Sequence, residues 1–430
     1  MKTQHIRLSA GLFAALLTLT LTLSAQILYW ETATGTWSTS SAQSNWSPTS
    51  GEAASTYWVD NSHAVIESAN PNITIGQSGA LTVEAASLTV QNGATFGGGG
   101  TAARRLNVAG SISGNFTVNI TASGGGGITA NGAANYNGTA TIQSGSFILN
   151  HTEAGGTDAH IVLSGGSLGL GTAIANNSVT IGSLSGTGSV SPNIGGTTGT
   201  RTLVINQSTN TTFSGTFIAG TTNRVLAVTK SGSGTLILEG ANAHQGQTLV
   251  NAGSLVLAAE STLAAATGDV VVNGATAILS TSVANANVGG NLTLSEGILR
   301  LNDTSAGSLT LAAGKDFTMS GGSIELSLDT IHDQIFGDGG NFSITGGTLV
   351  LDVTGAGFSY ENSWQIFSSF AGGSVTDLTI IGYDTAQYTA VLGNDGYLGF
   401  TAIPEPSALA LITGGVTLGS ILCRRRRNRC

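Results

Sequence analysis

The sequence predicts an all-β solenoid, in which short strands stack as successive coils of one chain. Glycine introduces an alternating strand at seven places, which are Gly145, Gly166, Gly234, Gly253, Gly297, Gly322 and Gly347. Subtraction gives spacings of 21 (145 to 166), 19 (234 to 253), 44 (253 to 297, two units of 22), 25 (297 to 322) and 25 (322 to 347). A drifting period of about 20–25 residues is typical of a solenoid. Beyond residue 25, no segment shows sustained helical periodicity.

The alternation predicts which side chains lie inside. Successive residues of a strand point to opposite faces, so alternate Leu, Ile and Val side chains are expected to form an inner column. Thr, Ser, Asn and Gln are expected to point outward, and glycine supplies the positive φ angles of the corners. One unit cannot bury its own apolar face, so stability is expected from stacking.

Residues 1–25 have the pattern of a secretory signal peptide. Lys2 and Arg7 precede the apolar run from Leu8 to Leu23, and Ser24-Ala25 supplies small residues for cleavage before Gln26. We therefore expect an exported chain.

Residues 26–70 depart from the repeat and are predicted to form an N-terminal cap. They hold four of the five tryptophans, Trp30, Trp37, Trp46 and Trp58, in a polar setting. A solenoid must cover its terminal rung, which would otherwise pair with other chains. The alternative is an aromatic platform that stacks on sugars; buried indoles favour the cap, and exposed coplanar indoles favour the platform.

Residues 71–358 are the predicted repeat region, and its best-formed unit runs from Val228 to Leu257. It contains Gly234-Thr-Leu-Ile-Leu, then Asn242-Ala-His244-Gln-Gly246, then Gly253-Ser-Leu-Val-Leu. This unit resembles the autotransporter-associated β-strand repeat of bacterial surface proteins. That family has an aromatic residue between the asparagine and the glycine, where this chain has His244. The resemblance implies a right-handed parallel β-helix with passenger-like character.

Residues 359–402 are rich in aromatic side chains and are predicted to form a C-terminal β cap or a small antiparallel unit. They include Tyr360, Trp364, Phe367, Phe370, Tyr383, Tyr388, Tyr397 and Phe400.

Residues 403–430 combine Pro404-Glu405-Pro406, an uncharged apolar run from Ala408 to Cys423, and a basic cluster of Arg424, Arg425, Arg426, Arg427 and Arg429. Cationic residues after an apolar stretch stay on the cytoplasmic side, so this end is predicted to stop translocation as one transmembrane helix. The apolar run is short for a span of roughly 17–25 residues. The order of the three elements resembles the PEP-CTERM sorting signal. The resemblance implies recognition and cleavage by an exosortase-type peptidase, with only a transient membrane anchor. An ordinary tail anchor is the alternative.

Charge and cysteine content exclude several classes of partner and site. Residues 26–403 carry seven basic and 22 acidic side chains, giving 7 − 22 = −15. Such an acidic surface disfavours nucleic acid and anionic lipid. Both cysteines, Cys423 and Cys430, lie in the tail, so no disulfide or thiolate metal site is expected in the exported part.

Catalytic chemistry has only weak candidates, and no cofactor or metal is expected. The richest acidic cluster comprises Asp329, His332, Asp333 and Asp338; we interpret it as a solvated turn, with a Ca²⁺ or catalytic cluster as the alternative. His151, Asp158 and His160 lie in a glycine-rich turn and are the second candidate for a metal or base. Gly124 to Gly127 are expected to form a wide turn. Basic residues are too sparse to predict an anion-binding groove, since Arg104-Arg105 is the only pair between residues 26 and 403.

These observations favour a non-catalytic protein of the cell surface or extracellular matrix, structural or adhesive in function. Its polar exterior and the PEP-CTERM resemblance imply association with extracellular polysaccharide. The alternatives are a polysaccharide lyase or hydrolase on the same scaffold, which needs converging carboxylates, and a carbohydrate-binding protein.

Overall fold

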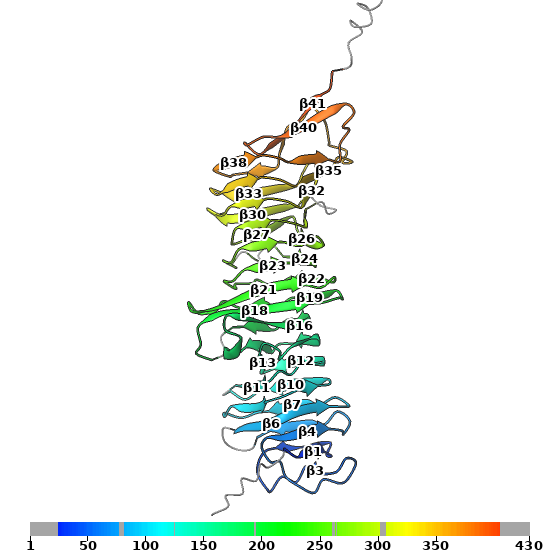
Figure 1. Cartoon of the computed structure of the whole chain (residues 1–430), viewed down its shortest axis with the longest axis vertical. Helices are drawn as coiled ribbons and strands as arrows, with labels where there is room; N and C mark the ends of the chain where they lie inside the picture. The colour runs from blue at the N-terminus through cyan, green and yellow to red at the C-terminus, as the bar shows by residue number, and fades with distance from the viewer. Residues whose placement is uncertain are drawn as a thin grey trace, which may run out of the picture.

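A computed structural model describes residues 25–76, 81–123, 125–192, 195–259, 263, 265–301 and 307–404. The chain winds into an elongated parallel β-solenoid, with the N-terminal coils at one end and β40 and β41 at the other (Figure 1). Among these residues, one 3₁₀ turn, η1 (Thr172–Ile174), interrupts the strands. The predicted all-β solenoid is confirmed.

The strands form parallel stacks along the rod. Two of these stacks, stack 1 and stack 2, begin at the N-terminal end. Stack 1 runs through β1 (Ile27–Trp30), β4 (Ser62–Ile66), β6 (Leu81–Val90), β8 (Arg104–Val108), β11 (Gly126–Ala130), β13 (Ser146–Leu149), β15 (Ser167–Leu170), β17 (Ser189–Ser191) and β20 (Thr216–Phe217), with β9 (Ile112–Ser113) beside β6. Stack 2 runs through β2 (Thr34–Trp37), β5 (Asn72–Ile75), β7 (Thr95–Gly98), β10 (Phe116–Ile120), β12 (Gly138–Ser144), β14 (Gly156–Leu163), β16 (Asn177–Gly186), β19 (Thr211–Phe213), β22 (Thr235–Leu238), β24 (Gly253–Leu257), β26 (Ala277–Thr281), β29 (Ile298–Arg300), β32 (Ser323–Ser327), β35 (Thr348–Asp352) and β39 (Thr379–Ile381).

Two further stacks begin midway along the rod. Stack 3 starts at β16 and continues through β18 (Gly199–Asn206), β21 (Arg224–Ser231), β23 (Thr248–Val250), β25 (Val270–Val272), β28 (Leu292–Leu294), β31 (Phe317–Met319), β34 (Asn341–Ile344) and β38 (Gly372–Val375). Stack 4 comprises β27 (Asn285–Val288), β30 (Ser308–Ala313), β33 (Gln334–Asp338) and β37 (Phe367–Ser368).

The predicted repeat spacings agree with the observed strand register. Ser146, which follows Gly145, pairs with Ser167, which follows Gly166. Thr235 and Ser254, which follow Gly234 and Gly253, pair in the same way. The double interval from Gly253 to Gly297 holds two coils, because β26 lies between β24 and β29. The seven motifs do not form one column, however: those at Gly145 and Gly166 build stack 1, and the other five build stack 2.

Burial follows the expected alternation, so the core is a continuous apolar column inside the coils. The strand Thr235–Leu238, for example, alternates half-buried and buried side chains. Leu236, Leu255, Leu279 and Leu299 follow one another in register, and all are buried. Each such leucine contributes about 1.5–3 kcal/mol by leaving water.

Asp and Asn side chains form a ladder of hydrogen bonds where successive strands of stack 3 begin. The backbone N–H of Asn291 donates to Asp269 Oδ1 (3.1 Å), and that of Asp316 donates to Asn291 Oδ1 (3.0 Å). The N–H of Asn341 then donates to Asp316 Oδ1 (2.7 Å). Asp and Asn alternate along this ladder, so that neighbouring side chains do not place two like charges side by side.

The N-terminal end is already part of the stacked coils. β1 pairs in parallel with β4, and β2 with β5, so parallel pairing starts before residue 71. The outer edge of β1 is covered by antiparallel β3 (Trp46–Ser47). Inside, the four tryptophans are fully buried, and Trp37 lies 4.8–4.9 Å from Trp46 and Trp58 between ring centroids. Indoles packed in this way fill the end of the core.

The C-terminal end contains both the final coil and an antiparallel unit. β37, β38 and β39 continue the parallel stacks after residue 359. The antiparallel sheet comprises β36 (Trp364–Gln365), β41 (Tyr397–Ala402) and β40 (Tyr388–Leu392). The rings of Tyr360 and Tyr388 stack at 3.9 Å beside it.

Candidate functional site: a polar groove on stack 1

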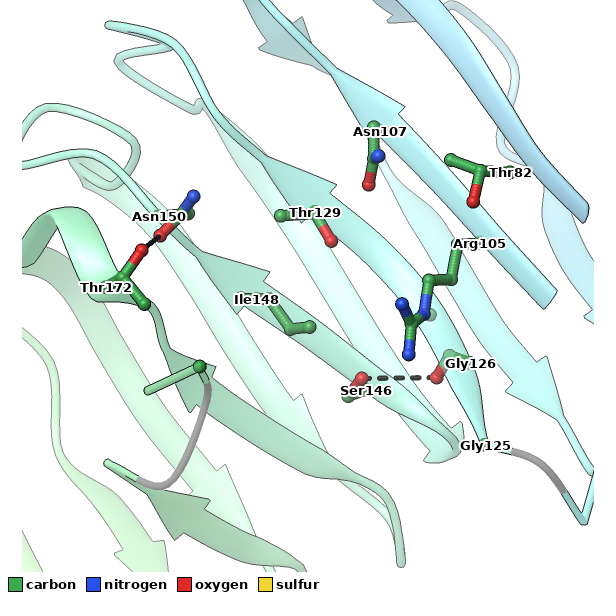
Figure 2. Close-up of a pocket in the computed structure, with 12 residues that line it drawn as sticks. Thr82, Arg105, Asn107, Gly125, Gly126, Thr129, Ser146, Ile148, Asn150 and Thr172 are labelled. Atoms are coloured by element: carbon green, nitrogen blue, oxygen red, sulfur yellow. Dashed lines mark hydrogen bonds between the residues drawn. The ribbon is translucent and has the colours of Figure 1, made fainter. Parts of the chain in front are cut away.

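A groove of about 540 Å³ crosses the outer face of stack 1 (Figure 2). Thr82, Arg105, Thr129 and Ser146 come to it from β6, β8, β11 and β13. Thr172 and Gly195 complete its far end. The remaining lining residues are Asn107, Gly125, Gly126, Gly127, Ile148 and Asn150. Adjacent strands lie about 4.8 Å apart, so the four strands alone span roughly 14 Å along the rod.

The hollow arises where a glycine interrupts an outward-facing row. In register, Thr82 pairs with Arg105, Arg105 with Gly127, and Gly127 with Ser146. Gly127 is buried and places no side chain between those of Arg105 and Ser146. A Cβ at this position would overlap the carbonyl oxygen of Ser146. The wide turn predicted for residues 124–127 is wrong in part, because Gly126 and Gly127 already belong to β11.

The groove contains one charged side chain, that of Arg105. It is exposed, and within the described ranges it has neither an ion pair nor a hydrogen bond. The neutral polar groups around it are partly fixed. Asn107 donates to Glu84 Oε1 (2.9 Å), Asn150 donates to Asn131 Oδ1 (2.8 Å), and Ser146 donates to the Gly126 carbonyl (3.1 Å). A free guanidinium beside ordered amides and hydroxyls suits an oxyanion on a hydroxyl-rich ligand.

Two more arginines bond to backbone carbonyls at the far end of the groove, whereas Arg104 is buried on the opposite face of β8. Arg104 precedes Arg105 and donates from Nη1 to the Ile75 carbonyl (3.4 Å). Arg201 is buried and donates from Nε to the carbonyl of Gly171 (3.0 Å), next to Thr172. Arg224 donates from Nη1 to the carbonyl of Gly195, a lining residue. Burial and the nearby charge of Arg224 lower the pKa of Arg201.

This concentration of charge is a departure from the sequence expectation. Of the seven basic residues between positions 26 and 403, Arg105 lines the groove, and Arg201 and Arg224 bond to the backbone at its far end. Arg105 is about a hundred residues from the other two in the sequence, so the fold brings together charges that the sequence keeps apart. The sequence feature that could have predicted the groove is Arg104-Arg105 followed, one coil later, by the glycine run at residues 124–127.

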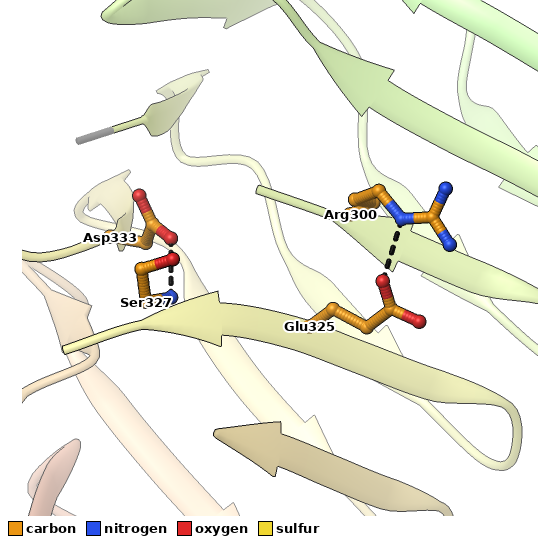
Figure 3. A network of polar contacts seen from close by, with 4 residues as sticks. All are labelled: Arg300, Glu325, Ser327 and Asp333. Atoms are coloured by element: carbon orange, nitrogen blue, oxygen red, sulfur yellow. Dashed lines mark hydrogen bonds and ion pairs between the residues drawn. The ribbon is translucent and has the colours of Figure 1, made fainter. Parts of the chain in front are cut away.

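The predicted acidic cluster does not converge on one point. Asp333 is fully buried, contrary to the solvated turn expected there. Its carboxylate accepts the backbone N–H groups of Gly307 (2.5 Å) and Ser327 (2.6 Å); Figure 3 shows the second. Asp329 is exposed, and the N–H groups of Thr330 and Gly357 lower its pKa. Asp338 is exposed at the end of β33. The Asp333 carboxylate therefore holds together the backbone at Gly307 and the end of β32 at Ser327.

His332 also has a structural environment. Its Nε2 lies 3.1 Å from the Gln365 carbonyl oxygen, and its ring meets Trp364 edge-on at 5.3 Å. The one ion pair of the described residues, Arg300 with Glu325 (2.6 Å), joins register partners on β29 and β32 nearby (Figure 3). In this partly exposed setting, such a pair contributes under about 1 kcal/mol.

The second candidate, His151 with Asp158 and His160, is not assembled into a ligand set. His151 Nδ1 accepts the N–H of Glu153 (3.1 Å), whereas His160 Nδ1 lies 2.8 Å from Ser183 Oγ on the next coil. Asp158 is exposed on β14. Within the described ranges, no three His, Cys, Asp or Glu side chains group closely enough to hold a metal ion.

The tryptophans predicted as a cap or as a sugar platform are all buried. Buried rings cannot stack on a polysaccharide, so the structure favours the cap interpretation at this end. Edge-to-face and tilted contacts hold the rings, as between Trp30 and Trp46 at 5.2 Å.

The best-formed repeat unit, residues 228–257, buries four polar side chains, those of Lys230, Asn242, His244 and Thr248. Asn242 Oδ1 accepts the N–H of Phe217 (2.7 Å) from the preceding coil. His244 packs against the Phe217 ring at 5.6 Å, and its Nε2 lies 2.7 Å from Thr248 Oγ1. Burial lowers the pKa of His244 to about 4. His244 thus packs in the core at the position where the repeat family has an aromatic residue.

Lys230 is the buried polar residue of this unit that carries a charge. Its ammonium group donates to the carbonyls of Ser231 (2.9 Å), Gly232 (2.9 Å) and Ala252 (3.1 Å), and burial lowers its pKa to about 8. It joins the turn between β21 and β22 to the turn between β23 and β24, and it is fully buried.

The terminal signals lie almost wholly outside the described residues. Residues 1–24 of the signal peptide, the apolar run 408–423 and the five tail arginines fall there, as do Glu405 and Pro406, whereas Ala25 and Pro404 are described and exposed. In the part of the chain that the structure covers, no helix is long and apolar enough to span a membrane.

A family model of the passenger-associated-transport-repeat matches residues 228–257. The match covers a small part of the chain, so it identifies the repeat unit and not the whole protein. Comparison with curated proteins found no match. The matched segment includes β22, β23 and β24, which pair with coils on both sides, so the autotransporter-type repeat expected there is confirmed.

Proposed function

We propose that this protein is a non-catalytic, secreted or cell-surface component of the extracellular matrix, with a structural or adhesive role. The observation that carries the proposal is the uninterrupted parallel stack from β2 to β39, in which each coil bonds to the next along the rod. The matched repeat supports export, because it is of the passenger type. A hydrogen-bonded stack of this kind is stiff, and its polar exterior offers many weak contacts.

The acids support a non-catalytic role over the lyase or hydrolase alternative. Hydrolysis of a glycosidic bond needs two carboxylates facing one groove. The acids of the expected cluster instead serve the backbone, as at Asp333 and Asp329. Among the described residues, no acidic side chain lines the groove on stack 1.

The proposal includes sorting by a C-terminal signal. Pro404-Glu405-Pro406, the apolar run and the arginine cluster at 424–429 would hold the exported chain transiently in the membrane until an exosortase-type peptidase cuts it. The solenoid would then be released or attached at the cell surface, and extracellular polysaccharide is the proposed partner.

Intact-mass analysis of the cell-bound and released protein from its native host tests the sorting step. The wild type is expected to lose its tail, whereas the triple variant Pro404→Ala, Glu405→Ala and Pro406→Ala is expected to keep it. Ser407→Ala, beside the motif, is the matched control and should be processed like the wild type. A tail retained in the wild type would mean a permanent anchor and would refute sorting by cleavage.

Fractionation of the matrix tests the role itself. Deletion of the gene is expected to weaken the matrix or its attachment to cells, and the released protein should co-purify with the polysaccharide. If the protein turned over a matrix polysaccharide and released shorter chains, the enzymatic alternative would replace the proposal.

A further inference from the structure

We infer that the groove on stack 1 is a binding site for an acidic polysaccharide, whose carboxylate pairs with Arg105 while its hydroxyls contact the surrounding amides and hydroxyls. The inference deepens the proposed matrix role and rests on it for the source of the ligand. It assigns a binding site, a class of ligand and a residue, Arg105, that recognises the negative charge of the ligand.

The shape of the groove suits an extended chain. It crosses β6, β8, β11 and β13 and reaches the loops at Thr172 and Gly195, so it runs along the rod and is not a closed pocket. Gly127 carries no side chain that would fill the space between Arg105 and Ser146. Along its length, Asn107, Thr129 and Asn150 offer neutral donors and acceptors to hydroxyl groups.

The charge of the groove selects an acidic ligand over a neutral one. Inside the described ranges, no acidic side chain lines it, and Arg105 is exposed without a partner. The carboxylate of Glu84, which does not line the groove, accepts a hydrogen bond from the lining residue Asn107. Arg201 and Arg224, held on the carbonyls of Gly171 and Gly195, add positive charge at the far end.

The negative net charge of the protein does not prevent an acidic ligand from binding in the groove. At physiological ionic strength, charges more than about 8 Å apart are largely screened. A carboxylate in the groove therefore interacts mainly with the arginines around it. A planar guanidinium binds a carboxylate in a two-pronged arrangement, which a hydroxyl group cannot match.

A matched pair of sugars tests the inference. The probes are an oligomer of β-1,4-linked mannuronate and the corresponding oligomer of β-1,4-linked mannose, which differ in the carboxylate alone. Binding is measured by calorimetry with the full chain in mild detergent. In every protein tested, the five arginines of the tail are changed to glutamine, so that the tail cannot bind the acidic probe.

Three proteins decide the result. In this background, the unchanged groove is expected to bind the mannuronate oligomer more tightly than the mannose oligomer. Arg105→Gln should weaken mannuronate binding about tenfold or more, as loss of a charge-assisted hydrogen bond does, and should leave mannose binding unchanged. Lys315→Gln removes one charge on a distant coil and should bind like the parent. Ligand-induced protection from hydrogen exchange should map to residues 104–130.

Several outcomes would overturn the inference. They are equal binding of the two sugars by the parent, no mannuronate binding at all, or an equal loss in Arg105→Gln and Lys315→Gln. Equally tight binding of a single-stranded DNA of the same charge would show a general polyanion site. If these occurred while the protein still co-purified with matrix, the groove inference would fail and the proposed function would stand.

Discussion

The buried imidazole of His244 should make the stability of its coil depend on pH. In the folded chain burial lowers the pKa of His244 to about 4, from an ordinary value of 6.5. The unfolded coil therefore binds a proton between pH 6.5 and 4, where the folded coil does not. Stability is present in full above pH 6.5 and is lost progressively as the pH falls towards about 4.

The magnitude follows from the size of the shift. A difference of 6.5 − 4 = 2.5 pKa units, at about 1.36 kcal/mol per unit, gives a loss of about 3 kcal/mol once the pH reaches 4. Between pH 7.5 and pH 4.5, His244 alone should cost about 2–3 kcal/mol. The environment explains why protonation is unfavourable, since the ring is buried against Phe217 and its Nδ1 has no hydrogen-bond partner among the described residues.

The perturbation is His244→Phe, which restores an aromatic ring and cannot titrate. Hydrogen exchange of peptides from residues 228–257 measures the free energy of opening of this coil at pH 7.5 and 4.5. The drop in that energy should be about 2–3 kcal/mol smaller in His244→Phe than in the wild type. The constant cost of leaving Thr248 Oγ1 without His244 cancels, because each protein is compared with itself.

His160→Gln is the control, because this exposed histidine contacts a serine on the next coil and should leave the pH dependence unchanged. If His244→Phe showed the same pH dependence as the wild type, the buried histidine would not be its source and the reasoning would be refuted.

Three further substitutions test the packing and bonding of the rod. Trp37→Ala should destabilise the N-terminal end by about 3–5 kcal/mol in thermal unfolding, because it empties the centre of the tryptophan cluster; a loss under about 1 kcal/mol would show that the cluster is not part of the core. Lys230→Met should cost about 1–3 kcal/mol by leaving three carbonyls without their ammonium donor, and a gain in stability on denaturant unfolding would contradict this. Asp316→Ala should cost about 0.5–1.5 kcal/mol, with faster amide exchange at Asn341, and unchanged exchange there would show that the ladder bond does not form in solution.

Most of the strand pattern was predictable because it depends on local rules. The spacing of the glycine-led motifs predicted which strands pair, as for the strands that follow Gly145 and Gly166 or Gly322 and Gly347, and these are the observed pairings. The coil at β26, which the double interval between Gly253 and Gly297 predicted, has no glycine-led motif because Ala277 stands where its register partners are glycines. Which stack each motif joins was not predictable, since stacks 1 and 2 use the same alternation.

The candidate site was less predictable. Asp333 could be named from the sequence, but its burial on two backbone N–H groups depends on a loop folding back over it. The groove depends on which residues of different coils become neighbours. Arg105, Gly127 and Ser146 are side by side through register and not through sequence proximity.

The sequence by itself determined the fold class, the repeat length and the inward or outward direction of most strand residues. These follow from a period of two within a strand and from a glycine-marked period between strands. The tertiary structure alone decided which sparse charges gather. Stacking brings residues of successive coils to about 4.8 Å from one another, although a whole coil of chain separates them in the sequence. Arg105 therefore faces a hollow at Gly127, with Arg201 and Arg224 at its far end.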